Sequence, residues 1–277
     1  MNNRWAFIGE LPTKVKGLIA DNGRNAVRGV IDAIYPAQLL DRDPHDPVNY
    51  AAPNEAMMLG GLSADTWGQI RFLSDEGCDM CARPLAGGIY LGAGGRCEGC
   101  TLKPFPFVRT RAACLYGEAS KSLILPFKHA DRTDIGPMFT QWIGRAAAEL
   151  IRDCDVIVPV PLHWTRLWTR RYNQAAEIAR PLARQYDKDY LADGLRRIKA
   201  TKRQSSRTER TKNVKGAFVV TPAGTRRLRG RHVVLVDDVF TTGATVRACA
   251  EALVAVGVRQ VDVAVIARAA PDMDAAL

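Results

Sequence analysis

Two acidic residues followed by a hydroxyl-rich turn form the stretch with the clearest chemistry. It runs from Val233 to Thr245 and reads VVLVDDVFTTGAT. Carboxylates such as Asp237 and Asp238 accept hydrogen bonds from vicinal sugar hydroxyls or bind a hard cation, whereas Thr hydroxyls donate to phosphate oxygens. These residue types side by side are typical of a site for a phosphorylated sugar.

The residues around this turn predict how it is held. Four aliphatic residues before the acids indicate a buried strand, and apolar residues at helical spacing from Val246 to Val254 indicate a helix. A loop entering a helix offers free N–H groups and a positive dipole to an anion, and Gly243 can adopt a positive φ there. An ordinary strand end with a Thr-rich helix cap is the alternative interpretation.

Four cysteines occur in two C-x-x-C pairs, Cys78 with Cys81 and Cys97 with Cys100. This spacing matches a four-thiolate zinc ribbon, and the intervening glycines supply the turns of a small metal-held hairpin. A redox dithiol or a loop without metal are the alternatives. A closed four-thiolate site is structural, so no catalysis is assigned to it.

A second group of candidates is basic. Arg166 follows a predicted buried strand, Val156 to Pro161, and a guanidinium at that strand end suits a pyrophosphate; the alternative is a solvated basic turn. The strip from Leu195 to Gly216 is rich in Lys and Arg. It fits a lid over a bound pyrophosphate, a nucleic-acid contact or a solvated hairpin.

Composition limits the class of protein. The 277 residues are 47% hydrophobic, which suffices for a core, and the net charge of +10 suits phosphorylated ligands or nucleic acid. No apolar run approaches the length of a membrane span, and the first ten residues lack a signal-peptide core. The sequence therefore predicts a cytoplasmic protein.

The predicted elements give an α/β fold. Strands are expected near 109–116, 156–161, 217–220, 233–236 and 261–266, and helices near 137–152, 174–186 and 246–257, with a further amphipathic helix before Pro36. The expected domains are an N-terminal helix with an irregular extension over 1–60, a small four-cysteine zinc-ribbon domain over 61–108, and an α/β domain over 109–277.

The stretch LVDDVFTTGAT resembles the phosphoribosyl pyrophosphate (PRPP) motif of type I phosphoribosyltransferases. The order of the cysteine pairs, IVPVPLH, RRYNQA and this motif further resembles the ComF/GntX family of competence-associated, phosphoribosyltransferase-like proteins. The resemblance covers roughly residues 62 to 268. It implies a type I phosphoribosyltransferase-like parallel sheet flanked by helices.

The resemblance also implies roles for individual residues. Asp237 and Asp238 would contact the ribose hydroxyls, and Arg166 would steady the leaving pyrophosphate. Arg210 would join the PRPP site, and Mg²⁺ would accompany the substrate. The 5′-phosphate would be held by the turn, namely Thr241, Thr242, Gly243, Ala244 and Thr245.

The sequence departs from the family pattern at three places. Family members carry a further cysteine pair where this chain has Ser63 and Thr66, and the segment 35–40 has no cysteine either, so a second zinc is not expected. Arg171 replaces a glycine before the aromatic residue of the RRYNQA element. The pyrophosphate-side loop is therefore expected to differ in shape.

Two functions remain open from the sequence. One is a phosphoribosyltransferase that transfers ribose 5-phosphate, although no residue stands out as a base. The other is a PRPP-sensing protein that binds single-stranded DNA and serves the DNA-uptake machinery. Base stacking needs aromatic residues, and the basic strip has none, but Tyr90, Phe105 and Phe107 lie near the ribbon.

Overall fold

The computed structural model describes residues 39–41, 61–73, 77–85, 91, 94–129, 132–163, 172–199, 214 and 216–269. The chain divides into two compact units, Met1–Trp67 and Gly68–Leu277. The helix expected before Pro36 lies outside the described residues. The expected division at residues 60 and 108 stays a prediction.

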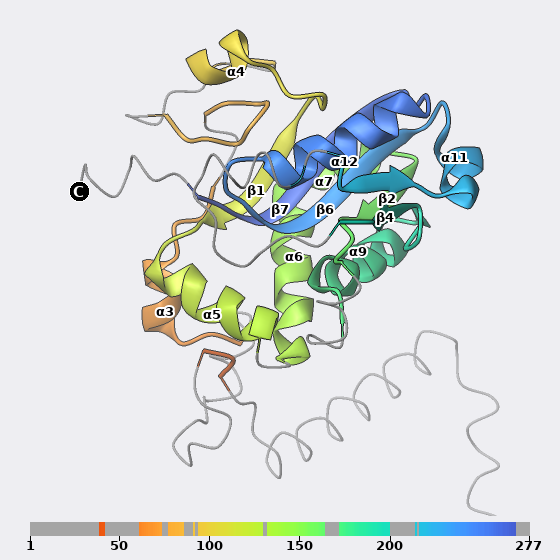
Figure 1. The fold of residues 1–277 in the computed structure, drawn as a ribbon. Coiled ribbons are helices and arrows are strands. Elements are labelled where there is room, and N and C mark those ends of the chain that lie inside the picture. Colours follow the sequence, from red (N-terminus) through yellow and green to blue (C-terminus); the bar gives the residue numbers. More distant parts are fainter. Residues whose placement is uncertain are drawn as a thin grey trace, which may run out of the picture. The chain divides into compact units, whose positions relative to one another are not determined.

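A five-stranded parallel sheet forms the centre of the second unit (Figure 1). Its strand order is β1-β7-β6-β2-β3, so the central strand β6 pairs with β7 on one side and β2 on the other. The strands are β1 (Thr110–Leu115), β2 (Val156–Pro159), β3 (Asp189–Tyr190), β6 (His232–Phe240) and β7 (Gln260–Arg268).

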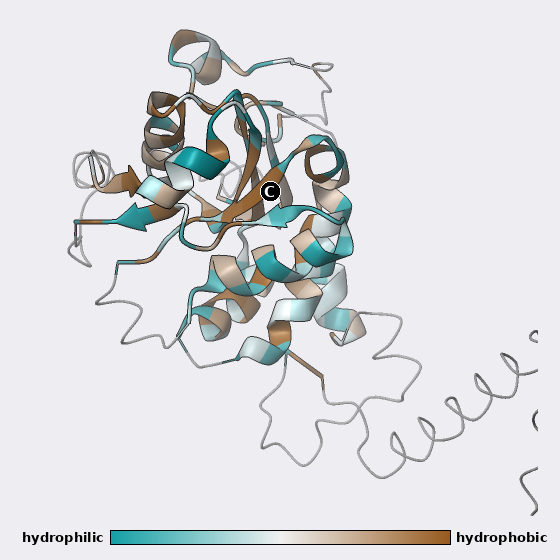
Figure 2. Cartoon of the chain, turned by 90° about the vertical axis from the view of Figure 1, so that its right-hand side faces the viewer, coloured by the Kyte–Doolittle hydropathy of each residue, from teal (hydrophilic) through white to brown (hydrophobic). Residues whose placement is uncertain are grey.

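Helices cover both faces of this sheet, which explains the continuous aliphatic runs of its strands. Helix α12 (Ala244–Ala255) packs on β6 and β7, whereas α6 (Gly136–Ala146) and α9 (Gln174–Gln185) pack together against the other face. Figure 2 shows the resulting apolar interior, with the hydrophobic colour concentrated in the strands. Residues Val233 to Val236 are completely buried.

The chain also forms a second, smaller sheet and further helices. Strands β4 (Leu195–Arg197) and β5 (Phe218–Val220) form a separate antiparallel pair beside α12, at the two ends of the basic strip. The other helices are α3 (Ala64–Gln69), α4 (Glu98–Leu102), α5 (Glu118–His129), η3 (Thr133–Ile135), α7 (Ala148–Asp153) and α11 (Pro222–Leu228).

The predicted α/β fold is confirmed, and its elements differ in detail from those expected. The helix expected over 137–152 is interrupted at Ala147, whose φ of −109° and ψ of 20° leave helical geometry. Strand β6 also continues through Asp237 and Asp238 to Phe240, because β7 pairs with it as far as Arg268. The two carboxylates are thus fixed by the sheet.

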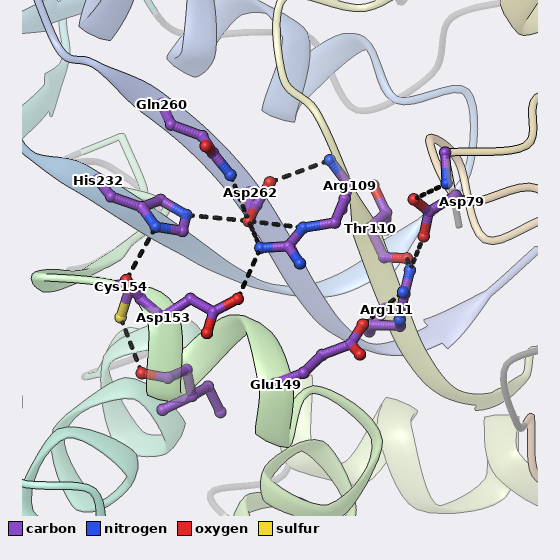
Figure 3. A network of polar contacts seen from close by, with 12 residues as sticks. Asp79, Arg109, Thr110, Arg111, Glu149, Asp153, Cys154, His232, Gln260 and Asp262 are labelled. Carbon is purple, nitrogen blue, oxygen red and sulfur yellow. Dashed lines mark hydrogen bonds and ion pairs between the residues drawn. The ribbon is translucent and has the colours of Figure 1, made fainter.

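A buried charge network joins β1, β6 and β7 at the amino end of the strands (Figure 3). Asp262 is fully buried, and its carboxylate accepts hydrogen bonds from the backbone N–H, Nε and Nη2 of Arg109. His232 Nε2 lies 2.9 Å from Asp262 Oδ2, and Gln260 Nε2 donates to the same oxygen. Burial alone would raise the pKa of Asp262, but the hydrogen bonds and charges of His232 and Arg109 lower it.

In the first unit, Asp41 connects two segments through hydroxyl groups. Its Oδ2 accepts hydrogen bonds from Ser63 Oγ and Thr66 Oγ1, each at 2.5 Å, and its Oδ1 accepts from the Ser63 backbone N–H at 3.2 Å. Ser63 and Thr66 are the residues that stand where the family pattern has cysteines. Here they bind a carboxylate.

None of the helices in the described part of the chain combines the length and the apolar character that a membrane crossing requires.

Candidate phosphate loop and four-cysteine site

The turn between β6 and α12 has the geometry expected of an anion-binding loop. Gly243 precedes the helix with φ of +74° and ψ of 4°, a left-handed conformation that favours glycine. A Cβ atom at this position would lie 2.6 Å from ring carbons of both Phe105 and Phe240. The loop therefore requires glycine for its conformation and for its packing.

The hydroxyls of the loop lie at this helix start. Thr241 is exposed, while Thr242, Ala244 and Thr245 are half-buried. Thr242 Oγ1 accepts a hydrogen bond from the Ala244 backbone N–H at 3.3 Å, so one of the free donors of the helix is capped. The predicted loop residues are thus brought together at one end of α12.

The two carboxylates lie just before this loop and differ in their surroundings. Asp237 Oδ1 accepts from the Asp238 backbone N–H at 2.9 Å, and Asp238 Oδ1 accepts from the Val239 N–H at 2.6 Å. Lys128 Nζ of α5 lies 3.1 Å from Asp238 Oδ2. Burial, together with the charge of Asp238, raises the pKa of Asp237 to about 7.

This raised pKa predicts a pH-dependent stability. The pKa of Asp237 in the folded protein lies above its value of 3.8 in the unfolded chain. The unfolded state therefore binds fewer protons between about pH 4 and 7, and the free energy of unfolding falls as pH rises through that window. We expect Asp237→Asn to remove this fall and to stabilise the protein by up to about 4 kcal/mol above pH 7, because the pKa differs by about three units between the two states.

The measurement is urea denaturation of both proteins between pH 4 and 8. Asparagine keeps the oxygen that accepts the Asp238 N–H, so the comparison isolates the charge. The difference between the two proteins should shrink towards pH 4, because the carboxyl becomes protonated in the unfolded state as well when the pH approaches its pKa of 3.8 there. A difference that is independent of pH would contradict the assignment.

Sequence reasoning missed two cations near the carboxylates. Lys128 lies far from the acids in the chain and reaches Asp238 only through the fold. Arg197 ends β4 with its guanidinium 5.3 Å from the ring centre of Phe218, and its charge counteracts the raised pKa of Asp237. No local sequence signal identifies either residue, since their partners come from other elements.

Two arginines were expected to contact the phosphates of PRPP. Both of them, Arg166 and Arg210, fall outside the described residues. Their roles stay predictions.

The four cysteines Cys78, Cys81, Cys97 and Cys100 form one cluster, with their Sγ atoms all within 4.8 Å of one another. The Sγ atoms of Cys81 and Cys97 are 3.9 Å apart. Zn–S bonds of about 2.3 Å in a tetrahedron separate the sulfurs by about 3.8 Å. The donor set and its spacing therefore fit a metal ion bound by four thiolates.

The local environment makes Cys78 the first of the four cysteines to lose its proton. Hydrogen bonding from the Cys81 thiol lowers the pKa of Cys78 to about 4, and the Cys97 backbone N–H also donates to Cys78 Sγ at 3.3 Å. The pKa of Cys81 is raised because it shares this proton with Cys78 and is buried, and burial raises the pKa of Cys100 to about 12. The other thiols would ionise only if a bound metal ion supplied a compensating positive charge.

Arg268 joins the cysteine cluster to the phosphate loop. Its buried guanidinium donates from Nε to the Cys81 carbonyl at 2.7 Å and from Nη1 to the Phe240 and Thr241 carbonyls at 3.1 and 2.9 Å. Phe105 follows the last cysteine and packs against Phe107 and Phe240. The cluster and the loop therefore share one packed structure.

Comparison with known proteins agrees with this arrangement. The phosphoribosyl transferase domain family matches residues 173–273. Competence protein F of Haemophilus influenzae is 30% identical over 219 residues, which cover 66% of this chain and 94% of that protein. DNA utilization protein YhgH of Escherichia coli is 32% identical over 174 residues, covering 60% of this chain and 75% of the relative.

Among solved structures, orotate phosphoribosyltransferase from Aeropyrum pernix covers 57% of this chain and 80% of its own at 15% identity, with a TM-score of 0.31. The family match, the parallel sheet and the loop together define a protein with a phosphoribosyltransferase domain. The chain belongs to the ComF family.

Proposed function

We propose that the protein binds PRPP with Mg²⁺ at the carboxyl end of β6. The proposal rests on one observation: two carboxylates at the end of β6 are followed directly by a loop in which Gly243 is left-handed, and this loop leads into the start of α12. Loop N–H groups and Thr hydroxyls would bind the 5′-phosphate, while Asp237 and Asp238 would accept hydrogen bonds from the ribose hydroxyls.

The reaction proposed for this site is transfer of ribose 5-phosphate. The bond from the ribose C1 to pyrophosphate breaks, the pyrophosphate leaves with the electron pair, and a nucleophile bonds to C1. The protein residues contribute position and charge, with Arg166 and Arg210 as the candidate partners of the phosphates. Mg²⁺ supplies charge neutralisation of the pyrophosphate when it is bound.

Zinc is the ion we propose for the four-cysteine cluster. Four thiolates at tetrahedral spacing are its usual structural site, and their reduced state accords with a cytoplasmic location. The cluster lies away from the carboxylates and is proposed to hold the loop in place through Arg268.

Calorimetric titration with PRPP, with and without Mg²⁺, tests the binding proposal. We expect saturable binding that depends on Mg²⁺ and weakens at least about 100-fold in the Asp237→Asn, Asp238→Asn variant, because both sugar contacts lose their charge. An Asp65→Asn, Asp134→Asn variant removes two other carboxylates as a control. Equal binding by the two variants would refute the proposed site.

A second candidate function is contact with single-stranded DNA during DNA uptake. The names of the relatives and the net charge of +10 favour it. The rings of Phe105 and Phe107, however, stack on each other at 4.7 Å and pack against Phe240, so they are occupied within the protein. Binding of an oligonucleotide that weakens steeply with added salt is the expected signature of backbone contacts.

A further inference from the structure

A cavity of about 360 Å³ lies between the four-cysteine cluster and the start of α12. Thirteen of the described residues line it, and none of these thirteen carries a carboxylate. Asp237 and Asp238 are not among the lining residues, so the cavity is separate from the carboxylate pair of the proposed PRPP site. Its volume falls at the small end of the range for ligand pockets in proteins.

Four cations converge on this cavity: Arg83, Lys103, Arg247 and Arg268. Arg247 is held in place, because its guanidinium lies 4.3 Å from the ring centre of Phe105 and its Nη2 donates to the Pro104 carbonyl at 3.1 Å. Lys103 is exposed at the rim. Within the described part of the chain, neither Lys103 nor Arg247 forms an ion pair with a carboxylate.

The charges around the cavity do not cancel. Four thiolates around a divalent metal ion would carry a net charge of about −2. Without counting Arg83, the cations Lys103, Arg247 and Arg268 carry +3 together, which leaves an excess of about +1 among the described residues even with the metal cluster filled. Thr241 and Thr242 also line the cavity. An anion with several oxygen acceptors is the ligand that this lining would stabilise.

We propose that this cavity binds a phosphate-bearing ligand of the size of a single nucleotide. Arg247 and Lys103 provide the charged contacts, since a guanidinium can donate to two phosphate oxygens and an ammonium adds a mobile point charge. The ligand is either a free nucleotide or one nucleotide unit of a strand, which share the same phosphate chemistry. The hydroxyls of Thr241 and Thr242 are assigned to the 5′-phosphate of PRPP, so Arg247 and Lys103 hold the second ligand.

The test uses calorimetric titration of the metal-loaded full chain with thymidine 5′-monophosphate and, separately, with a short oligothymidylate. The variant Lys103→Gln, Arg247→Gln removes two charges while its side chains keep much of their length, and its metal content and melting temperature verify that it folds. The matched control is Arg226→Gln, Arg227→Gln, which removes two exposed charges from α11.

We expect saturable binding of at least one probe, weakened at least about tenfold in the Lys103, Arg247 variant and unchanged in the control. If the monophosphate binds more tightly, the ligand is a free nucleotide; if the oligothymidylate binds more tightly, the ligand is a unit of a strand. Saturating PRPP and Mg²⁺ should leave a binding site for the probe, and this holds even if PRPP itself fails to bind. Absence of binding, equal loss in both variants, or simple displacement by PRPP would overturn the proposal.

Discussion

Replacement of Asp262 by alanine is expected to lower the free energy of unfolding by about 3 to 5 kcal/mol. The carboxylate is fully buried and holds Arg109, His232 and Gln260 together. Its removal leaves a guanidinium and an imidazole without their acceptor in a place that water reaches poorly, and such desolvated groups account for the large effects of buried ion-pair mutations. Urea denaturation at neutral pH measures the change.

The exposed ion pair between Glu118 and Lys121 provides the control. Their side chains are 91% and 42% exposed, so Glu118→Ala should change the free energy of unfolding by no more than about 0.5 kcal/mol. A similarly small effect of Asp262→Ala would show that the network in Figure 3 contributes little to stability.

Replacement of Cys81 by serine is expected to remove the metal from the four-cysteine cluster and to lower the melting temperature by at least about 10 °C. Metal affinity at such a site is folding free energy, and each kcal/mol lost shifts the melting temperature of a domain of this size by roughly 2 to 4 °C. Metal content by elemental analysis and differential scanning calorimetry measure the two effects.

Cys154→Ala is the matched control for the loss of a thiol. Cys154 is also buried, but it lies outside the cluster and donates to the Ile151 carbonyl. This variant should keep one full complement of metal and lose far less stability. If the two variants melt alike and keep the same metal content, the four cysteines do not form a metal site.

The parts of the site that were predictable from the sequence are those encoded in adjacent residues. The loop from Asp237 to Thr245 carries its strand, its glycine and its helix start in one stretch, and each C-x-x-C pair places two thiols on one turn. Local sequence therefore contained both the residue types and the geometry that hold them.

The contacts that were missed depend on segments distant in sequence. Lys128 meets Asp238 because α5 follows β1 at the same end of the sheet, and Arg268 meets the Cys81 carbonyl because β7 ends beside the cluster. The break at Ala147 falls in a run of three alanines, Ala146 to Ala148, which favour a continuous helix. Such features arise from packing, which a pattern of hydrophobic residues does not specify.

The hydrogen bonds of Arg268 have a consequence for how the molecule opens. One guanidinium donates to a carbonyl of the cysteine segment and to two carbonyls at the end of β6, so detachment of either partner leaves part of this buried guanidinium without an acceptor. Local unfolding in proteins proceeds in contiguous cooperative units. We therefore expect the four-cysteine segment and the loop after β6 to open together, with similar rates of backbone hydrogen exchange with solvent.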